Sequence, residues 1–205
     1  MRVRVALLCA LALTGCADGK KGEAPHERYP VTQIWFDETT LAAAVPEKTR
    51  VRIWVRLDGR RIAAFHSTVR RSDGTPVYES DWTAGRPKDF RSREWPDCQE
   101  HTEPPPSPRL TTLDDLLEDV LGPRTRPADA RPVRGTAGAW EISRGVGVLR
   151  IIEHGGYLDR EVETYSTKGR IAGRITGART APAAALPAWE QNWSSCRPAT
   201  TEPRS

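Results

Sequence analysis

The sequence predicts a mainly β protein, an antiparallel β-sandwich with one short α-helix, with a small β-barrel as the alternative. Short segments of alternating apolar and polar residues lie on both sides of a Pro-rich middle region, and such alternation is typical of β-strands. Asp-Gly and Gly-Gly pairs, which are typical of hairpin turns, separate several of these segments. One helical pattern lies between the two β-rich halves. Because connections are short within each half and long between them, a sandwich is favoured over a barrel.

The clearest strand lies at residues 50–57 (RVRIWVRL). The Asp58-Gly59 pair that follows predicts a tight hairpin, with residues 62–69 as the return strand. A second pair, Asp73-Gly74, predicts a turn into a strand at residues 77–82, which completes a three-stranded antiparallel meander. The first strand has two unlike faces, one with Val51, Ile53, Val55 and Leu57 and the other with Arg52, Trp54 and Arg56.

The middle of the chain shows no periodic pattern between residues 84 and 109, so we expect an irregular connection there. Its stiffest part is residues 103–108 (EPPPSP), because prolines favour an extended polyproline II course. Residues 123–135, rich in Pro and Arg, are expected to form a second connection.

One helix is expected between these two connections. Thr112 is a suitable N-cap, and Asp115 three residues later completes a pattern similar to a capping box. Gly122-Pro123 marks its end. A helix of about three turns is not stable alone, so we expect its apolar face to cover the sheet or to close one end of a barrel. That face consists of Leu113, Leu116, Leu117, Val120 and Leu121.

The second β-rich half contains four candidate strands. Residues 157–165 fit either a strand or a helix, because their apolar side chains would also share one helical face. In the last candidate, Gly173 and Gly177 predict bends or a close approach of the backbone. The candidates are residues 139–143, 146–152, 157–165 and 170–177.

The first residues are typical of a bacterial export signal, with Arg2 and Arg4 before an apolar run at residues 5–13 that is too short to span a bilayer. The sequence Leu13-Thr14-Gly15-Cys16 resembles the lipobox of bacterial lipoproteins. The resemblance implies that the sulfur of Cys16 receives a diacylglycerol and that the chain is cut before this residue. Ala17 in the next position implies the outer membrane, under the sorting rule of enteric bacteria. The chain is therefore expected to be held by lipid on the periplasmic face of that membrane.

The chain divides into four expected parts. Residues 31–196 form a single β-rich domain, and the segments around it lack apolar periodicity. The other parts are a lipoprotein signal peptide at residues 1–15, a lipidated flexible tether at 16–30 and a disordered tail at 197–205.

The net charge argues against a nucleic-acid partner. Loss of Arg2 and Arg4 with the signal lowers the formal charge from +4 to +2, and the remaining basic residues are spread along the chain. Nucleic-acid binding requires a clustered basic patch.

The four cysteines have separate expected fates. Cys9 leaves with the signal, and Cys16 carries lipid. Cys98 and Cys196 remain as an even pair in an oxidising compartment, which predicts a disulfide between them.

No catalytic motif is present, and we expect neither an enzyme nor a cofactor or metal site. The local group Glu153, His154 and Asp159 is best interpreted as an exposed hairpin tip, since zinc sites need several close ligands. A cleft that brought His66 or His154 to acids and a nucleophile would instead indicate an enzyme such as a hydrolase.

The possible ligand-binding residues are Arg52, Trp54 and Arg56, which share one strand face. If exposed, this face could bind a sugar ring or an anionic polymer by stacking and charge. We favour the interpretation that the helix or a second sheet covers Trp54 while the arginines extend past it to water. The expected function is a non-enzymatic, lipid-anchored envelope lipoprotein that binds a protein partner or supports an envelope assembly. The alternative is a periplasmic binder of cell-wall glycan or of a small apolar ligand.

Overall fold

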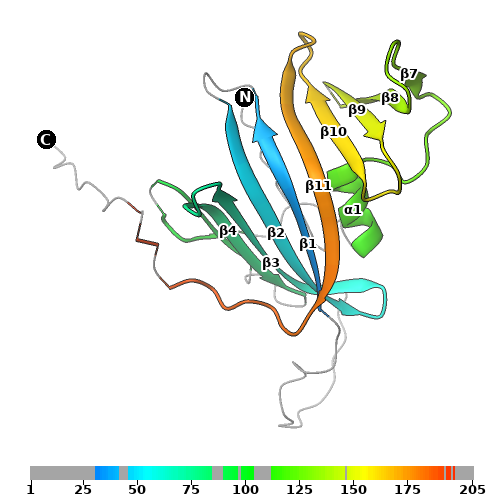
Figure 1. Ribbon diagram of the computed structural model, residues 1–205. Helices are drawn as coiled ribbons and strands as arrows, with labels where there is room; N and C mark the ends of the chain where they lie inside the picture. Colours follow the sequence, from blue (N-terminus) through cyan, green and yellow to red (C-terminus); the bar gives the residue numbers. More distant parts are fainter. Residues whose placement is uncertain are drawn as a thin grey trace, which may run out of the picture.

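The computed structural model is built around one antiparallel sheet (Figure 1), and its described residues form eleven strands and one helix. The described residues are 31–41, 46–84, 90–96, 98–103, 112–145, 147–191, 193, 194 and 196. The strands are β1 (Val31–Thr40), β2 (Glu47–Asp58), β3 (Arg61–Arg71), β4 (Pro76–Thr83), β5 (Phe90–Glu94), β6 (His101–Glu103), β7 (Arg131–Pro132), β8 (Ala139–Arg144), β9 (Gly147–Glu153), β10 (Arg160–Tyr165) and β11 (Ile171–Ala183).

The two β-rich halves form two meanders that meet in the middle of the sheet. The strand order is β6-β5-β4-β3-β2-β1-β11-β10-β9-β8-β7, with β1 paired to β11 from Val31↔Ala183 to Thr40↔Gly173. The mainly antiparallel β class with one helix is confirmed, and the architecture is consistent with a β-sandwich. Within the described ranges the edge strands β6 and β7 do not pair with each other, so the sheet is not closed into a barrel.

The pairing of β1 with β11 is irregular at one position. The register shifts between Trp35 and Asp37 on β1, opposite Arg179 and Thr176 on β11. Gly177 lies in this bulge with a φ of +66°, a conformation that glycine adopts without a steric cost. The bend expected at Gly177 is therefore present, but it lies in the middle of β11, because the strand continues beyond the expected end at residue 177 to Ala183.

The helix α1 (Leu113–Leu121) begins and ends where the sequence predicts. The Oγ1 of Thr112 accepts a hydrogen bond from the Asp115 backbone N–H at 3.1 Å, and Asp115 Oδ2 accepts one from the Thr112 N–H at 2.9 Å. The helix ends before Gly122, whose φ is +76°. Its buried residues join the core on one face of the sheet, together with residues such as Ile34, Ile53 and Ile151. In Figure 1 this helix lies against the part of the sheet that contains β10 and β11.

Two segments expected to be irregular contain strands, so those predictions were incomplete. β5 and β6 fall within residues 84–109, and the short β7 falls within 123–135. The β5 sequence FRSRE lacks an alternating apolar pattern, because its Arg91 and Arg93 pair with acidic side chains of β4 instead of entering the core. Apolar periodicity cannot detect such a strand.

The segment that fitted either a strand or a helix is a strand from residue 160 onward. β10 lies between β9 and β11, and its side chains alternate. Val162 is buried in the core, while Glu163 on the opposite face accepts a hydrogen bond from Arg174 on β11. Pairing on both sides satisfies the backbone of this segment, which an isolated sequence pattern does not reveal.

Residues 1–30 and 197–205 lie outside the described residues, and with them the predictions about the signal peptide, Cys16, the tether and the tail. In the described part of the chain, no helix has the length and apolar character needed to cross a bilayer.

Candidate functional site

The face of the sheet opposite α1, called the outer face here, carries the possible ligand-binding residues. Strand alternation places Ile53 in the core with the helix and Trp54 on the outer face. Cross-strand pairing from β1 to β5 aligns outer-face side chains into two rows. One row is Trp35, Arg52, Thr68, Glu79 and Arg93, and the other is Gln33, Trp54, His66, Asp81 and Arg91.

The structure brings Arg52 and Trp54 to this face, and Arg56 follows them along β2. Arg52 is exposed, Trp54 and Arg56 are half-buried, and the Trp54 ring lies 5.7 Å from the His66 ring. The expectation that the helix or a second sheet covers Trp54 is wrong, because α1 packs on the face that holds Ile53 and the described strands form a single sheet. Trp54 is partly shielded by its own neighbours on the outer face.

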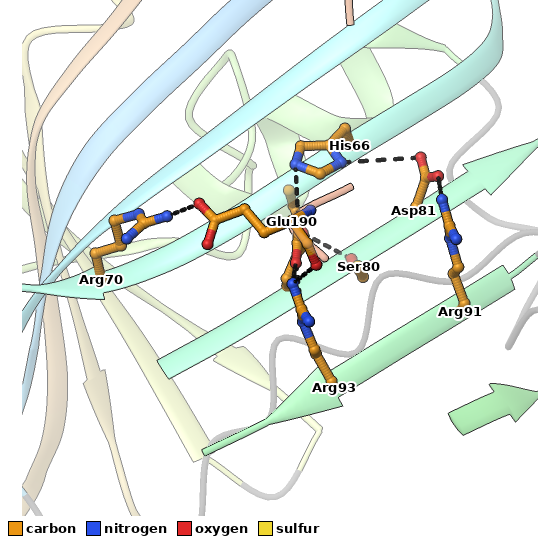
Figure 2. A network of polar contacts seen from close by, with 9 residues as sticks. His66, Arg70, Ser80, Asp81, Arg91, Arg93 and Glu190 are labelled. Carbon is orange, nitrogen blue, oxygen red and sulfur yellow. Dashed lines mark hydrogen bonds and ion pairs between the residues drawn. The ribbon is translucent and has the colours of Figure 1, made fainter. Parts of the chain in front are cut away.

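A group of ionisable residues, buried at its centre, lies beside Trp54. His66 Nε2 is 3.4 Å from Glu79 Oε1, and both side chains are 1% exposed. Arg93, at 6% exposure, donates from Nε to Glu79 Oε2 at 3.0 Å and from Nη2 to the same oxygen. On the other side, His66 Nδ1 lies 3.9 Å from Asp81 Oδ1, and Asp81 accepts a hydrogen bond from Arg91 at 3.0 Å. Figure 2 shows Asp81 between His66 and Arg91.

A segment that follows β11 packs against this group. We call the described residues 186–191, 193, 194 and 196 the C-terminal strap. The Glu190 backbone N–H donates to Glu79 Oε1 at 3.1 Å, and the Glu190 carbonyl accepts a hydrogen bond from Arg93. The Glu190 carboxylate forms an ion pair with Arg70 on β3 (Figure 2). The strap is therefore bound to three strands by polar contacts.

Two tryptophans and the disulfide complete the attachment of the strap. The Arg93 guanidinium lies 4.7 Å from the Trp189 ring centroid and 4.4 Å from that of Trp193, within range for cation–π attraction. The predicted disulfide between Cys98 and Cys196 is present, with the two Cα atoms 5.8 Å apart.

Burial decides the chemistry of His66. It lowers the pKa of the imidazole, and the nearby Glu79 and Asp81 carboxylates oppose this effect without cancelling it. The imidazole is therefore neutral at neutral pH. Ser67 and Ser80 flank the group in sequence, but their hydroxyls bind each other at 2.7 Å, and strand alternation places them on the core face. His66 is thus enclosed, and Glu79, which lies 3.4 Å from it, also accepts the hydrogen bond from the Glu190 backbone N–H that helps to hold the strap.

A pocket of about 300 Å³ opens on the outer face next to this group, between the ends of β1, β2 and β3. Arg70 connects the pocket to the strap, because it lines the pocket and forms an ion pair with Glu190. A hydrogen bond from Arg50 at 2.9 Å lowers the pKa of Asp37, so this carboxyl is charged at neutral pH. The lining residues are Asp37, Lys48, Thr49, Arg50, Arg52, Thr68, Arg70, Arg71, Ser72 and Gly74.

The local acidic group near residue 154 does not form a site. His154 is exposed, and Glu153 binds Arg160 at 2.6 Å. Across the described ranges, no three His, Cys, Asp or Glu side chains are placed to hold a metal ion.

Sequence reasoning missed the contributions of Arg70, Arg91, Arg93, Glu79 and Glu190. One signal was present: acidic and serine residues alternate in VYESDW, and arginines alternate in FRSRE. Complementary charge patterns in consecutive segments can indicate paired strands.

No protein-family model matches the chain, and no curated protein has a similar sequence.

Proposed function

We propose that the protein is a non-enzymatic lipoprotein of the bacterial cell envelope, held by lipid on Cys16 at the periplasmic face of the outer membrane. Its β-rich domain binds a protein partner through the outer face of β1–β5 and supports an envelope assembly. The lipobox-like sequence before Cys16 supports the anchor. Two or three acyl chains hold a protein on a bilayer stably.

The observation that carries the binding proposal is the concentration of arginine and tryptophan on the outer face. Arg52 is exposed there, and Trp54, Arg91 and Trp189 are half-buried, with Arg91 4.3 Å from the Trp189 ring centroid. Tryptophan and arginine contribute a large share of the binding energy at protein interfaces. The Arg91 guanidinium is held in place by Asp81 and by the Trp189 ring, which lowers the entropy that this side chain loses on binding.

A cell-wall glycan is the alternative ligand, since Trp54 beside Arg52 offers an aromatic ring and a cation to a sugar carrying an acidic group. A small apolar ligand is less favoured. The pocket on this face is lined mainly by charged and polar residues, whereas sites for apolar ligands are mostly hydrophobic.

The anchor is tested by processing and by fractionation. Globomycin, which blocks lipoprotein signal peptidase, should cause the uncut precursor to accumulate. The Cys16→Ser variant should be found outside the membrane fraction. Normal processing in the presence of globomycin would contradict lipidation at Cys16.

The binding surface is tested by photo-crosslinking in intact cells. A photoreactive amino acid in place of Arg52 should give a discrete crosslinked protein that mass spectrometry identifies. The matched control is the same amino acid in place of Arg134, which is exposed in the loop between β7 and β8. A crosslink to glycan would favour the alternative. The same product from both positions, or none from Arg52, would reject the outer face as the binding surface.

A further inference from the structure

The pocket beside Arg52 holds an unusual concentration of positive charge. Its lining contains five cationic side chains and one acidic side chain, Asp37. The cations come from β2 and β3, so the sheet fixes their backbone positions relative to one another. They are Lys48, Arg50, Arg52, Arg70 and Arg71.

Ion pairs neutralise only part of this charge. Asp37 accepts a hydrogen bond from Arg50 at 2.9 Å and lies 3.7 Å from Lys48 Nζ. Outside the lining, Glu47 pairs with Arg71, and Glu190 pairs with Arg70. Asp73 also lies close enough to Arg71 for charge attraction. Among the described residues, four carboxylates therefore face five cations, which leaves one positive charge without a balancing acid.

Among the described residues, Arg52 is the cation of the pocket that makes no ion pair or hydrogen bond, and its side chain is exposed. Its cross-strand neighbour Thr68 also lines the pocket. The pocket thus has a free guanidinium beside a hydroxyl group, with further cations around them.

We propose that this pocket binds a phosphate-type oxyanion, carried by a small molecule or by a lipid headgroup. Guanidinium groups bind phosphate oxygens through paired N–H donors. Several donors around one space suit a tetrahedral group, whose free oxygens point in different directions, better than a planar carboxylate. A volume of about 300 Å³ lies within the range of ligand pockets, and admits a diphosphate or a phosphate with its carrier.

Asp37 allows the proposed site to be tested by two substitutions with opposite effects on anion affinity. Its pKa is lowered by the hydrogen bond from Arg50, so it is charged at neutral pH and repels an entering anion. Removal of this charge should strengthen anion binding, whereas removal of the Arg52 charge should weaken it.

The first experiment is isothermal titration of the purified full-length mature protein with inorganic phosphate and with pyrophosphate, in a phosphate-free buffer near 0.15 M salt. Arg52→Gln should weaken binding about tenfold, as expected for a lost hydrogen bond to a charged group. Asp37→Asn should strengthen it about threefold, because a like charge near the anion is removed. The matched control is Arg60→Gln, which removes the same charge from the exposed β2–β3 turn and should leave affinity unchanged.

The second experiment separates the two sources of the phosphate group. Vesicles of phosphatidylcholine with or without phosphatidylglycerol are mixed with the Cys16→Ser variant, so that no acyl chain contributes to binding. Binding that requires phosphatidylglycerol and Arg52 supports a lipid headgroup. Binding of soluble pyrophosphate alone supports a free phosphate compound.

The proposal is overturned if phosphate and pyrophosphate show no saturable binding, or if acetate binds as tightly. It is also overturned if Arg60→Gln weakens binding as much as Arg52→Gln, or if Asp37→Asn fails to strengthen it. Chemical shifts of the Thr68 and Gly74 amides, which line the pocket, should move on titration while that of Gly135 does not. The titration requires neither lipid on Cys16 nor a protein partner, so its result is separate from the test of the proposed function.

Discussion

The Arg70 guanidinium forms an ion pair with the Glu190 carboxylate, 120 residues further along the chain. Arg70 also lines the basic pocket, and Glu190 belongs to the C-terminal strap. This contact therefore joins the pocket to the segment that closes over His66, Glu79 and Arg93. Loss of the strap would free a cation in the pocket and expose a buried ionic group.

The buried pair of Glu79 and Arg93 should be important for stability. Glu79→Gln leaves the Arg93 charge buried at 6% exposure without its counterion, so we expect a loss of about 3–5 kcal/mol in the free energy of unfolding. Urea denaturation followed by circular dichroism measures this loss. The comparison variant is Asp114→Asn, whose ion pair with Arg124 is exposed and should change stability by less than about 1 kcal/mol. Equal effects would show that burial of the first pair has no energetic consequence.

The disulfide between Cys98 and Cys196 should stabilise the fold by restricting the unfolded chain. The two residues are 98 positions apart, and a loop of this size corresponds to about 4–5 kcal/mol in the chain-entropy model. Replacing both cysteines with serine should lower the urea midpoint accordingly. Peptide mass spectrometry without reductant should recover the linked pair, and alkylation of either cysteine before reduction would contradict it.

Stability should fall as the pH is lowered through the range in which His66 titrates when unfolded. Burial lowers the pKa of His66 in the folded state, so near pH 6.5 the unfolded chain takes up a proton that the folded protein does not. The contribution of neutral His66 to the free energy of unfolding is thus complete above the pKa that His66 has in the unfolded chain, and it decreases below that pKa. The groups that face His66 are Glu79 and Asp81 on β4 and the two arginines of β5.

This decrease is measured as the unfolding free energy between pH 7.5 and 5.5, for the wild type and for His66→Gln. The variant should lose this part of the pH dependence. Carboxyl groups with lowered pKa values change the unfolding free energy in a separate range, at lower pH. Burial raises the pKa of Glu163, but hydrogen bonds from Tyr165 and Arg174 outweigh this effect, so its contribution is present above the usual carboxyl pKa and lost on acidification below it. An unchanged slope in His66→Gln would reject His66 as the source.

Replacement of Gly122 at the end of α1 should destabilise the fold. Its φ is +76°, and a Cβ atom there would lie 2.5 Å from Ile151 Cδ1. Gly122→Ala is therefore expected to cost about 2–4 kcal/mol, from backbone strain and from displacement of the core. Gly135 has a similar φ of +79° with no atom within 4 Å of a Cβ, so Gly135→Ala should cost only the backbone part, about 1–2 kcal/mol. Thermal unfolding of the two variants measures the difference in stability. Equal losses of stability would show that the Ile151 side chain moves aside without an energetic cost.

The sequence by itself determined the elements that depend on neighbours in the chain. The hairpin at Asp58-Gly59, the alternating strand around Ile53 and the capped helix after Thr112 are all present where predicted. Their signals are turn chemistry, a period of two and a capping box, which act over a few residues. The pairing of Cys98 with Cys196 was also accessible, because the expected fates of Cys9 and Cys16 left only these two cysteines.

Only the tertiary structure decided which charges meet. Whether Arg93 faces Glu79 depends on the register between β4 and β5, and whether Glu190 reaches Arg70 depends on the path of a strap 120 residues away. The basic pocket likewise exists because β2 and β3 place Arg52 and Thr68 side by side. Local patterns specify backbone conformation, whereas ion pairs and pockets require the backbone to bring distant segments together. For this reason the sequence predicted the β-rich scaffold, and the fold alone assembled the candidate site.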